Sequence, residues 1–326
     1  MDQDNKIENI KNNLIRQLDK VMRSTNEKSI KTRYRYYEAN KRFCGFLAKE
    51  YRLQKYANIK EKHFVRYAEY LKEEGYSASY QKTELSAIRF FAEKSGNKNL
   101  LPDNKKLDLG KREIGALDRA WTREEIDNAM RLAKSTGRSD LLYEIKMGSI
   151  FGMRLEEVCK CQVNHIKNAI QNQELYIRGK NGQIRYLHLR TTEQKELAKE
   201  LLKYAEANKR LGTDRIIYDN VKGATEKEKK MIQNWITNHR NKFQDTSRER
   251  LEENKRLEED AAKNGVKLKT ENITFHGLRH YFAQQRFAYY LKQGYTEHQA
   301  RINVSEELGH HRESVTQIYL SKKVNG

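Results

Sequence analysis

A histidine, an arginine and a second histidine stand close together in the stretch TFHGLRHYFAQQ, from Thr274 to Gln285. At helical spacing His276, Arg279 and His280 fall within one turn, and their apolar neighbours predict a helix that faces a core. An arginine rarely enters a core without an anionic partner. Arg279 is therefore expected to meet either a protein carboxylate, which is the simpler interpretation, or a phosphate.

Three other segments place polar groups in unusual contexts. Arg154 lies in IFGMRLEEV, directly after an apolar run and a glycine. Lys180 stands at the turn of ELYIRGKNGQIRYLHL, residues 174 to 189, where two alternating runs flank Lys-Asn-Gly and predict a β-hairpin with a basic tip. His310 follows a Leu-Gly step, and Tyr319 comes nine residues later. Each of these signals is weak when it is taken alone.

In their order and spacing, these segments resemble the tyrosine recombinase (phage integrase) family of site-specific DNA recombinases. The resemblance runs from about Leu117 to Tyr319, and a helical region before it is similar, more loosely, to that family's core-binding domain. The matching residues are Gly152, Arg154 and Glu157, then Lys180 and Arg185, then His276 and Arg279, then Leu308 to His310, and finally Tyr319. The complete ordered set is far more specific than any one of its parts.

The chemistry of such an enzyme explains these residue types. When a tyrosine hydroxyl attacks a phosphodiester, the phosphorus passes through a pentacoordinate state with extra negative charge on its non-bridging oxygens. Two arginines, here Arg154 and Arg279, can each offer a planar fork to those oxygens and stay charged throughout. The phosphotyrosyl bond formed by Tyr319 would conserve the energy of the broken bond, so that rejoining needs no ATP, metal or other cofactor.

The resemblance also implies roles for the other matching residues. Lys180 would donate a proton to the leaving 5′ oxygen, and His276 would be the general acid/base partner of the tyrosine. His310 would donate a hydrogen bond to the phosphate, and Glu157 would orient Arg154 by ion pairing. His280 has no place in the family pattern and is expected to be a packing or phosphate-adjacent residue.

The composition agrees with a polyanionic partner. The chain has 326 residues, with 65 Lys and Arg against 45 Asp and Glu and a formal net charge of +20. Such a balance favours nucleic acid, although charge that only aids solubility is the alternative. No apolar run approaches the roughly 20 residues that cross a bilayer, and the polar N-terminus is unlike a signal peptide. These features predict an intracellular protein, cytoplasmic and nucleoid-associated, without a membrane partner. The Cys-x-Cys pair Cys159 and Cys161 is a weak zinc signal, and reduced structural thiols are expected.

Helical periodicity, a single proline and the resemblance together predict a mainly α protein with a small β-sheet or hairpin. The expected parts are an N-terminal amphipathic helix (1–23), a helical, SAM-like core-binding domain (24–100), a linker (101–116) and a catalytic domain (117–326). The resemblance implies that the two domains form a C-shaped DNA clamp. Between Lys31 and Arg66 there are 11 Lys or Arg against three Glu. The residues expected to contact the DNA backbone are Lys31, Arg33, Arg35, Lys41 and Arg42, together with Arg185 in the hairpin.

Several helices are expected in the second part of the chain. Thr122 and Glu125 have the spacing of a capping box. Helical patterns run from there to about Leu142, from Ile145 to Phe151, through Leu202, and from Met231 to Phe243. The almost wholly polar stretch 244–270 predicts an exposed helical insertion or a loop.

The resemblance further implies double-stranded DNA with specific recombination sites as the substrate and a homo-tetramer on synapsed DNA. Strand exchange would pass through a Holliday junction, for integration, excision or inversion of a mobile element, and an accessory factor would set direction. Three alternatives stay open: a topoisomerase-like relaxing enzyme, a DNA-binding regulator without catalysis, and a metal hydrolase using His276, His280 and His310. The last is disfavoured because Arg279 would repel the ion.

Overall fold

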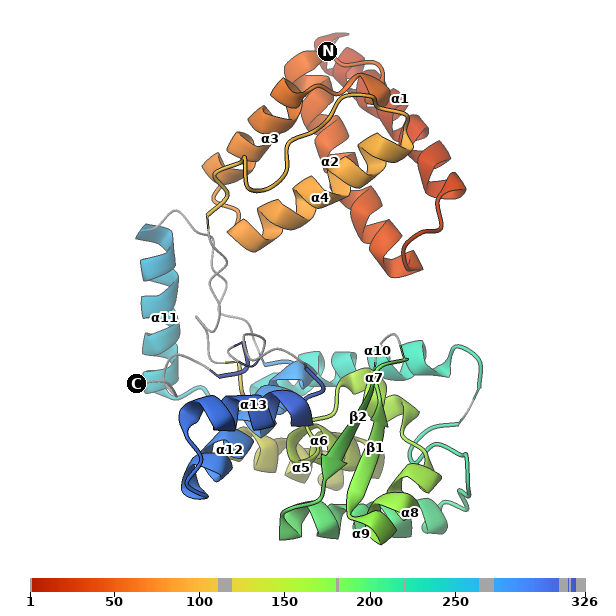
Figure 1. Cartoon of the computed structure of the whole chain (residues 1–326), viewed down its shortest axis with the longest axis vertical. Helices are drawn as coiled ribbons and strands as arrows, with labels where there is room; N and C mark the ends of the chain where they lie inside the picture. The colour runs from red at the N-terminus through yellow and green to blue at the C-terminus, as the bar shows by residue number, and fades with distance from the viewer. Residues whose placement is uncertain are drawn as a thin grey trace. The chain divides into compact units, whose positions relative to one another are not determined.

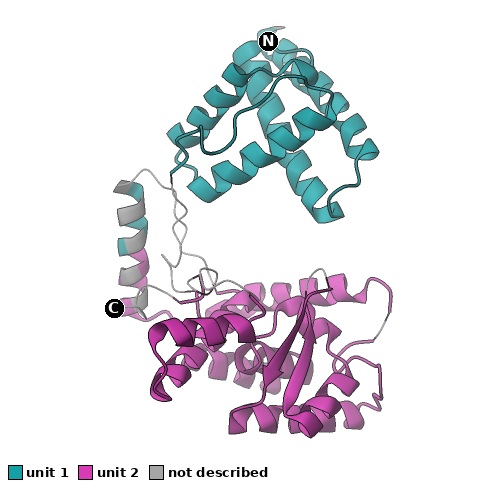
Figure 2. Ribbon diagram, viewed as in Figure 1, with its two compact units in different colours: residues 1–113, 256–269 teal, residues 114–255, 270–326 magenta. Residues whose placement is uncertain are grey.

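The computed structural model describes residues 2–110, 119–179, 182–219, 221–263, 273–310, 316 and 318–320. The chain divides into two compact units, which are coloured separately in Figure 2: residues 1–113 with 256–269, and residues 114–255 with 270–326. Among the described residues, no helix is both long and apolar enough to span a membrane.

Unit 1 is built from helices with one short 3₁₀ turn (Figure 1): α1 (Asp2–Ser24), α2 (Ile30–Tyr51), η1 (Tyr56–Asn58), α3 (Glu61–Glu73) and α4 (Ala78–Lys94). Side-chain caps mark two of the helix starts. Ser29 accepts a hydrogen bond from the Thr32 amide and Ser77 accepts one from the Tyr80 amide. These caps satisfy amides that have no partner within the helix.

The core of unit 1 includes the N-terminal helix. Leu14 and Leu18 on α1 are fully buried, as are Phe43, Phe64 and Phe91, and all five belong to one apolar cluster. The amphipathic pattern of the first 23 residues is therefore explained by packing of α1 against α2, α4 and η1 of the same unit.

The segment after α4 also packs onto unit 1. Leu101, Leu107 and Leu109 are buried in the same cluster, and the Arg89 side chain donates to the Pro102 carbonyl at 2.7 Å. The first part of the predicted linker, residues 101–110, thus lies against the helices. Residues 111–118 of that linker are outside the described part of the chain.

Unit 2 is also mainly helical, and its helical elements are α5 (Arg123–Ser135), α6 (Ser139–Ile150), α7 (Leu155–Lys160), α8 (Val163–Asn172), α9 (Thr192–Ala207), α10 (Ala224–His239), η3 (Arg240–Lys242), α12 (Phe275–Lys292) and α13 (Glu297–Glu307). The capping box of Thr122 and Glu125 is confirmed, with both reciprocal hydrogen bonds present. The break between two helices that was predicted near Leu142 is found earlier in the chain, between α5 and α6. The chain turns at Gly137, which has a φ of +69°, and α6 runs unbroken through the predicted gap.

Helix α11 (Arg248–Lys263) lies within the polar stretch that was expected to be a helical insertion or a loop. Its described side chains are mostly exposed, in agreement with the polar composition of the stretch.

The predicted hairpin is present as β1 (Glu174–Arg178) and β2 (Ile184–His188), which pair in antiparallel register with Ile177 opposite Arg185. Burial alternates along both strands. The buried face carries Leu175, Ile177 and Leu187, as expected for a strand packed on a core. It also carries Arg185, whose side chain is only 4% exposed.

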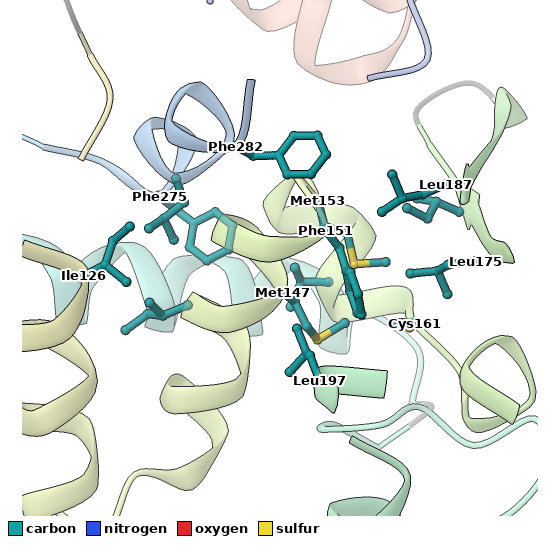
Figure 3. Packing of buried hydrophobic residues seen from close by; sticks show 14 of the residues in the cluster. Ile126, Met147, Phe151, Met153, Cys161, Leu175, Leu187, Leu197, Phe275 and Phe282 are labelled. Atoms are coloured by element: carbon teal, nitrogen blue, oxygen red, sulfur yellow. The ribbon is translucent and has the colours of Figure 1, made fainter. Parts of the chain in front are cut away.

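The core of unit 2 brings α6 and α12 close together. A Cβ at Gly148 on α6 would stand 2.9 Å from a methyl group of Leu278, so the glycine permits close contact between the two helices. Figure 3 shows Phe275 and Phe282 of α12 near Met147, Phe151 and Met153 in this cluster. This packing fixes α12, which carries His276, Arg279 and His280.

Candidate active site

The loop before α7 is shaped by Gly152. Its φ is +60°, and a Cβ there would lie 2.4 Å from the ring of Phe282. Only glycine fits both the left-handed backbone and this close approach. The loop places Arg154 at the N-cap of α7 with its side chain 30% exposed. The Gly152 carbonyl points toward two other arginines, Arg185 and Arg279, and accepts from both.

Glu157 is the shared partner of three guanidinium groups. One carboxylate oxygen lies 2.6 Å from Nη1 of Arg154, and the other lies 3.1 Å from Nη2 of Arg185 and 3.9 Å from Nη1 of Arg279. Burial by itself would raise the pKa of this carboxyl, but the three cations outweigh it and lower the pKa to about 2. The carboxylate is therefore ionised at neutral pH and offsets part of the positive charge at this site.

Arg279 is fully buried on α12. Its terminal nitrogens donate to the carbonyls of Gly152 and Leu308, and Nη2 lies 3.5 Å from Nε2 of His310. Burial and the neighbouring arginines lower its pKa to about 9, which still leaves it charged at pH 7. The partner expected from the sequence thus consists of backbone carbonyls and a carboxylate.

His310 contacts both Tyr319 and the arginines Arg154 and Arg279. Gly309 has a φ of +67° and turns the chain after α13, and the Ser305 hydroxyl donates to the His310 carbonyl at 2.6 Å. The imidazole Nε2 lies 3.2 Å from the Tyr319 hydroxyl and 3.3 Å from Nη2 of Arg154. One histidine therefore bridges the tyrosine and an arginine.

Tyr319 is 5% exposed and lies among three imidazoles and a guanidinium. Its ring centroid is 4.8 Å from that of His280, 5.6 Å from that of His310 and 5.7 Å from that of His276. The guanidinium carbon of Arg279 lies 5.6 Å from the same centroid. His280, which the family pattern left out, therefore lies against the tyrosine. The signal in the sequence was its position four residues after His276, on the same helix face.

All three imidazoles have depressed pKa values. Burial, followed by the charge of neighbouring arginines, lowers the pKa of His310 to about 4. Desolvation and the same kind of neighbours lower the pKa of His276 to about 4, although this side chain reaches the surface. His280 is buried, and its pKa falls to about 3 through burial and the charges of His276 and Arg119. At neutral pH these rings are uncharged, so each has one N–H donor and one nitrogen acceptor for hydrogen bonds.

Lys180 lies outside the described residues. Its neighbour Gly179 is described, and the Gly179 amide donates to the Gln183 carbonyl at 2.7 Å. A Cβ at Gly179 would lie 3.1 Å from Glu157 Oε1 and 3.7 Å from Arg154 Nη1. The end of β1 that leads to Lys180 therefore lies against the Arg154–Glu157 ion pair.

Arg185 differs from its predicted place at a DNA surface. The side chain is buried and donates to the carbonyls of Glu307 and Gly152 and to the Glu157 carboxylate. Burial lowers its pKa, and the Glu157 charge opposes that effect. A DNA backbone cannot reach this guanidinium where it lies, because protein groups surround it.

The five basic residues predicted on the first domain all lie on α2. Lys31, Arg35 and Arg42 are exposed, and Arg33 donates to the Thr25 carbonyl. Lys41 pairs with Glu38 at 3.1 Å and Arg42 with the buried Glu84 at 2.5 Å. Lys31, Arg35 and Arg42 are thus the solvent-exposed members of the five.

The described residues contain no group of three or more His, Cys, Asp or Glu side chains that could hold a metal ion. Cys44, Cys159 and Cys161 are buried free thiols. The described side chains around Tyr319 supply guanidinium, imidazole and carboxylate groups beside the phenol.

The fold is that of two-domain tyrosine recombinases. A lambda integrase tetramer bound to a Holliday junction is similar with a TM-score of 0.57 at 16% identity, over 93% of this chain and 76% of that chain. The XerH site-specific recombinase bound to palindromic difH substrate, a post-cleavage complex, is similar with a TM-score of 0.54 at 18% identity, over 94% and 80%. At these identities the likeness establishes the fold alone.

Two family models match the sequence itself. The phage integrase N-terminal SAM-like domain matches residues 14–100, and the phage integrase family matches residues 120–325. No curated protein sequence matches the chain significantly. Because the second model alone covers more than half of the chain, the protein belongs to the phage integrase family of DNA recombination enzymes.

Proposed function

We propose that this protein is a site-specific recombinase that cuts and rejoins DNA strands through a 3′-phosphotyrosyl intermediate on Tyr319. The observation that carries the proposal is the position of His310 Nε2, which lies 3.2 Å from the Tyr319 hydroxyl, 3.3 Å from Arg154 and 3.5 Å from Arg279. One histidine nitrogen thus contacts groups from three other segments, and the phenolic oxygen is one of these groups.

In the proposed reaction the Tyr319 oxygen attacks phosphorus and the bond from phosphorus to the 5′ oxygen breaks. Arg154 and Arg279 stabilise the charge that develops on the non-bridging oxygens. His276, neutral at pH 7, accepts the phenolic proton, and Lys180 supplies a proton to the leaving oxygen. His310 donates to the phosphate. Attack by a 5′ hydroxyl on the phosphotyrosyl bond reverses every step, so no external energy source is needed.

The test is covalent trapping on a nicked suicide substrate that carries the recombination site. Wild-type protein is expected to form an adduct that survives denaturing electrophoresis. Tyr319→Phe is expected to bind the same DNA and form none, because the variant loses only the attacking oxygen. An adduct formed by Tyr319→Phe would show that another residue is the nucleophile.

The trapping assay and a plasmid-relaxation assay together separate the alternative functions. A catalytically inactive DNA-binding regulator would form no adduct in either protein. A topoisomerase IB-like enzyme would relax a supercoiled plasmid that lacks any recombination site. The gathering of Arg154, Arg279 and His310 around Tyr319 favours strand cleavage over regulation, because DNA binding alone does not require it.

The assembly proposed for the reaction is a homo-tetramer on two synapsed sites that exchanges strands through a Holliday junction. The lambda integrase tetramer on such a junction, which shares this fold, supports the proposal. The biological outcome proposed is integration, excision or inversion of a mobile element at specific sites, with an accessory factor setting direction and the nucleoid as the place of action. Native electrophoresis of Tyr319→Phe with two labelled sites tests for the synaptic complex.

A further inference from the structure

Arg185 directs both terminal nitrogens of its guanidinium to groups inside the protein. Nη2 donates to Glu157 Oε2 at 3.1 Å and to the Gly152 carbonyl at 3.2 Å, and Nη1 donates to the Glu307 carbonyl. A guanidinium has a fixed planar fork, so these contacts set the position of the strand that bears it relative to both segments. One side chain of β2 therefore joins the loop before α7 to the end of α13.

The aliphatic stem of Arg185 is fixed as well. A Cβ at Gly309 would lie 2.8 Å from Arg185 Cδ and 3.1 Å from its Cβ. The stem therefore fills the space over the turn that leads to His310. The head and the stem together hold β2 against the two segments that supply Arg154 and His310.

The hairpin held in this way carries Lys180. Arg185 pairs in register with Ile177, two residues before Gly179, and Gly179 lies against Glu157 and Arg154. The hairpin end thus lies against the same Arg154–Glu157 ion pair whose carboxylate Arg185 contacts. A strand that loses its anchor at Arg185 would no longer hold the chain next to Lys180 at a fixed distance from the site.

We propose that Arg185 is a positioning residue that anchors the β1–β2 hairpin and so delivers Lys180 to the leaving 5′ oxygen. This inference rests on the proposed function, in which Lys180 protonates that oxygen as the bond to phosphorus breaks. Arg185 touches neither the phosphate nor the tyrosine and acts through the lysine.

A substrate with sulfur in place of the bridging 5′ oxygen tests this role. A thiol is far more acidic than an alcohol, so a 5′ thiolate leaves without a proton from the protein. A variant that has lost only proton donation should cleave the sulfur substrate at a rate near that of the wild type. A variant that has lost stabilisation of the phosphate should cleave both substrates slowly.

The variants are Arg185→Gln, Arg185→Lys, Lys180→Ala, Arg279→Gln and Arg178→Gln, assayed for single-turnover cleavage with saturating protein. Arg185→Gln is expected to cleave the oxygen substrate about 100-fold more slowly than wild type, the cost of misplacing a catalytic group. It should recover most of that loss on sulfur, as Lys180→Ala should. Arg279→Gln should stay slow on both substrates.

Arg178→Gln is the matched control, because Arg178 is an exposed arginine on the same hairpin. It should show the wild-type ratio of rates on the two substrates. Arg185→Lys keeps the charge without the fork and should show a smaller loss with the same sulfur recovery. Thermal melting of all variants identifies any that do not fold. If Arg185→Gln does not fold, the rates of Arg185→Lys on the two substrates test the proposal.

The outcomes distinguish a failure of the anchoring role of Arg185 from a failure of the proposed function. Sulfur recovery in Lys180→Ala without recovery in Arg185→Gln and Arg185→Lys would overturn the anchoring role while leaving the proposed function intact. Absence of recovery in Lys180→Ala as well would overturn the role of Lys180 together with the inference. A fall in the salt dependence of DNA binding by about one phosphate contact in both Arg185 variants, without sulfur recovery, would instead show a direct backbone contact.

Discussion

Glu157 shows how a single carboxylate can organise a cationic site. It lies within 4 Å of Arg154, Arg185 and Arg279, and its side chain is 1% exposed. Without this charge, three guanidinium groups would repel one another in a poorly solvated region. The net charge that remains is positive, which suits a phosphate. The sequence predicted the pairing with Arg154, whereas the other two partners come from the fold.

The histidines around Tyr319 lead to a prediction about pH. His280 has a folded pKa of about 3, below the ordinary value of 6.5, so the unfolded chain takes up a proton first as the pH falls. The folded state therefore loses stability as the pH falls from 6.5 to about 3. Glu157, with its low pKa, contributes to acid unfolding only below about pH 4.5.

The measurement is the melting temperature of the wild type and of His280→Asn across that window. The variant should lose less stability than wild type on going from pH 6.5 to pH 5, by up to about 2 kcal/mol. His298→Asn, a change at an exposed histidine on α13, serves as the control. A His280→Asn curve parallel to the wild type would contradict a neutral, buried imidazole.

At the scale of elements, the turn between α6 and α7 decides where Arg154 lies. Gly152 and Gly212 have nearly the same left-handed φ, +60° and +61°. They differ in surroundings: a Cβ at Gly152 would be 2.4 Å from Phe282, and one at Gly212 would meet nothing within 4 Å. Alanine variants of these two glycines therefore separate the cost of backbone strain from the cost of a steric conflict with Phe282.

Gly212→Ala is expected to cost about 1 kcal/mol of unfolding free energy, from the strained backbone alone. Gly152→Ala should cost about 2–4 kcal/mol, because the core around Phe282 must also shift. It should slow cleavage as well, since the loop carries Arg154. Chemical denaturation of both variants gives the two values, and equal costs would show that the Phe282 contact yields without strain.

At the scale of the whole molecule, the two units have separate cores. We expect unit 1 to bind the DNA backbone and unit 2 to cut the strand. Unit 1 places the exposed Lys31 and Arg35 one turn apart on α2, and unit 2 contains the residues around Tyr319. The formal charge of +20 predicts DNA binding that weakens steeply with salt.

Changing Lys31 and Arg35 to glutamine tests where the backbone is contacted. Each change should reduce the slope of log affinity against log salt by about 1, with little dependence on DNA sequence. Arg66→Gln is the control, because Arg66 is ion-paired with Glu73 at 2.8 Å on α3. A titration by fluorescence anisotropy at several salt concentrations measures the slopes. Unchanged slopes for Lys31 and Arg35 would remove this face of α2 from the DNA interface.

The sequence by itself determined the kinds of groups and the local elements. Helix periodicity, the capping box at Thr122 and the hairpin of residues 174–189 depend on interactions between near neighbours, and all three are present. The ordered set of Arg154, Arg279, His310 and Tyr319 also marked the family, because it depends on residue types at definite spacings.

Only the tertiary structure decided which of these groups touch, because several of the contacts join residues more than a hundred positions apart. Arg154 meets His310 across 156 positions and Arg185 meets Glu307 across 122. Alternation along β2 indicated that Arg185 shares a face with Leu187, yet an arginine on a strand is ordinarily expected at the surface. Its burial is possible because Glu157 and the Gly152 and Glu307 carbonyls, from other parts of the chain, accept hydrogen bonds from its terminal nitrogens there.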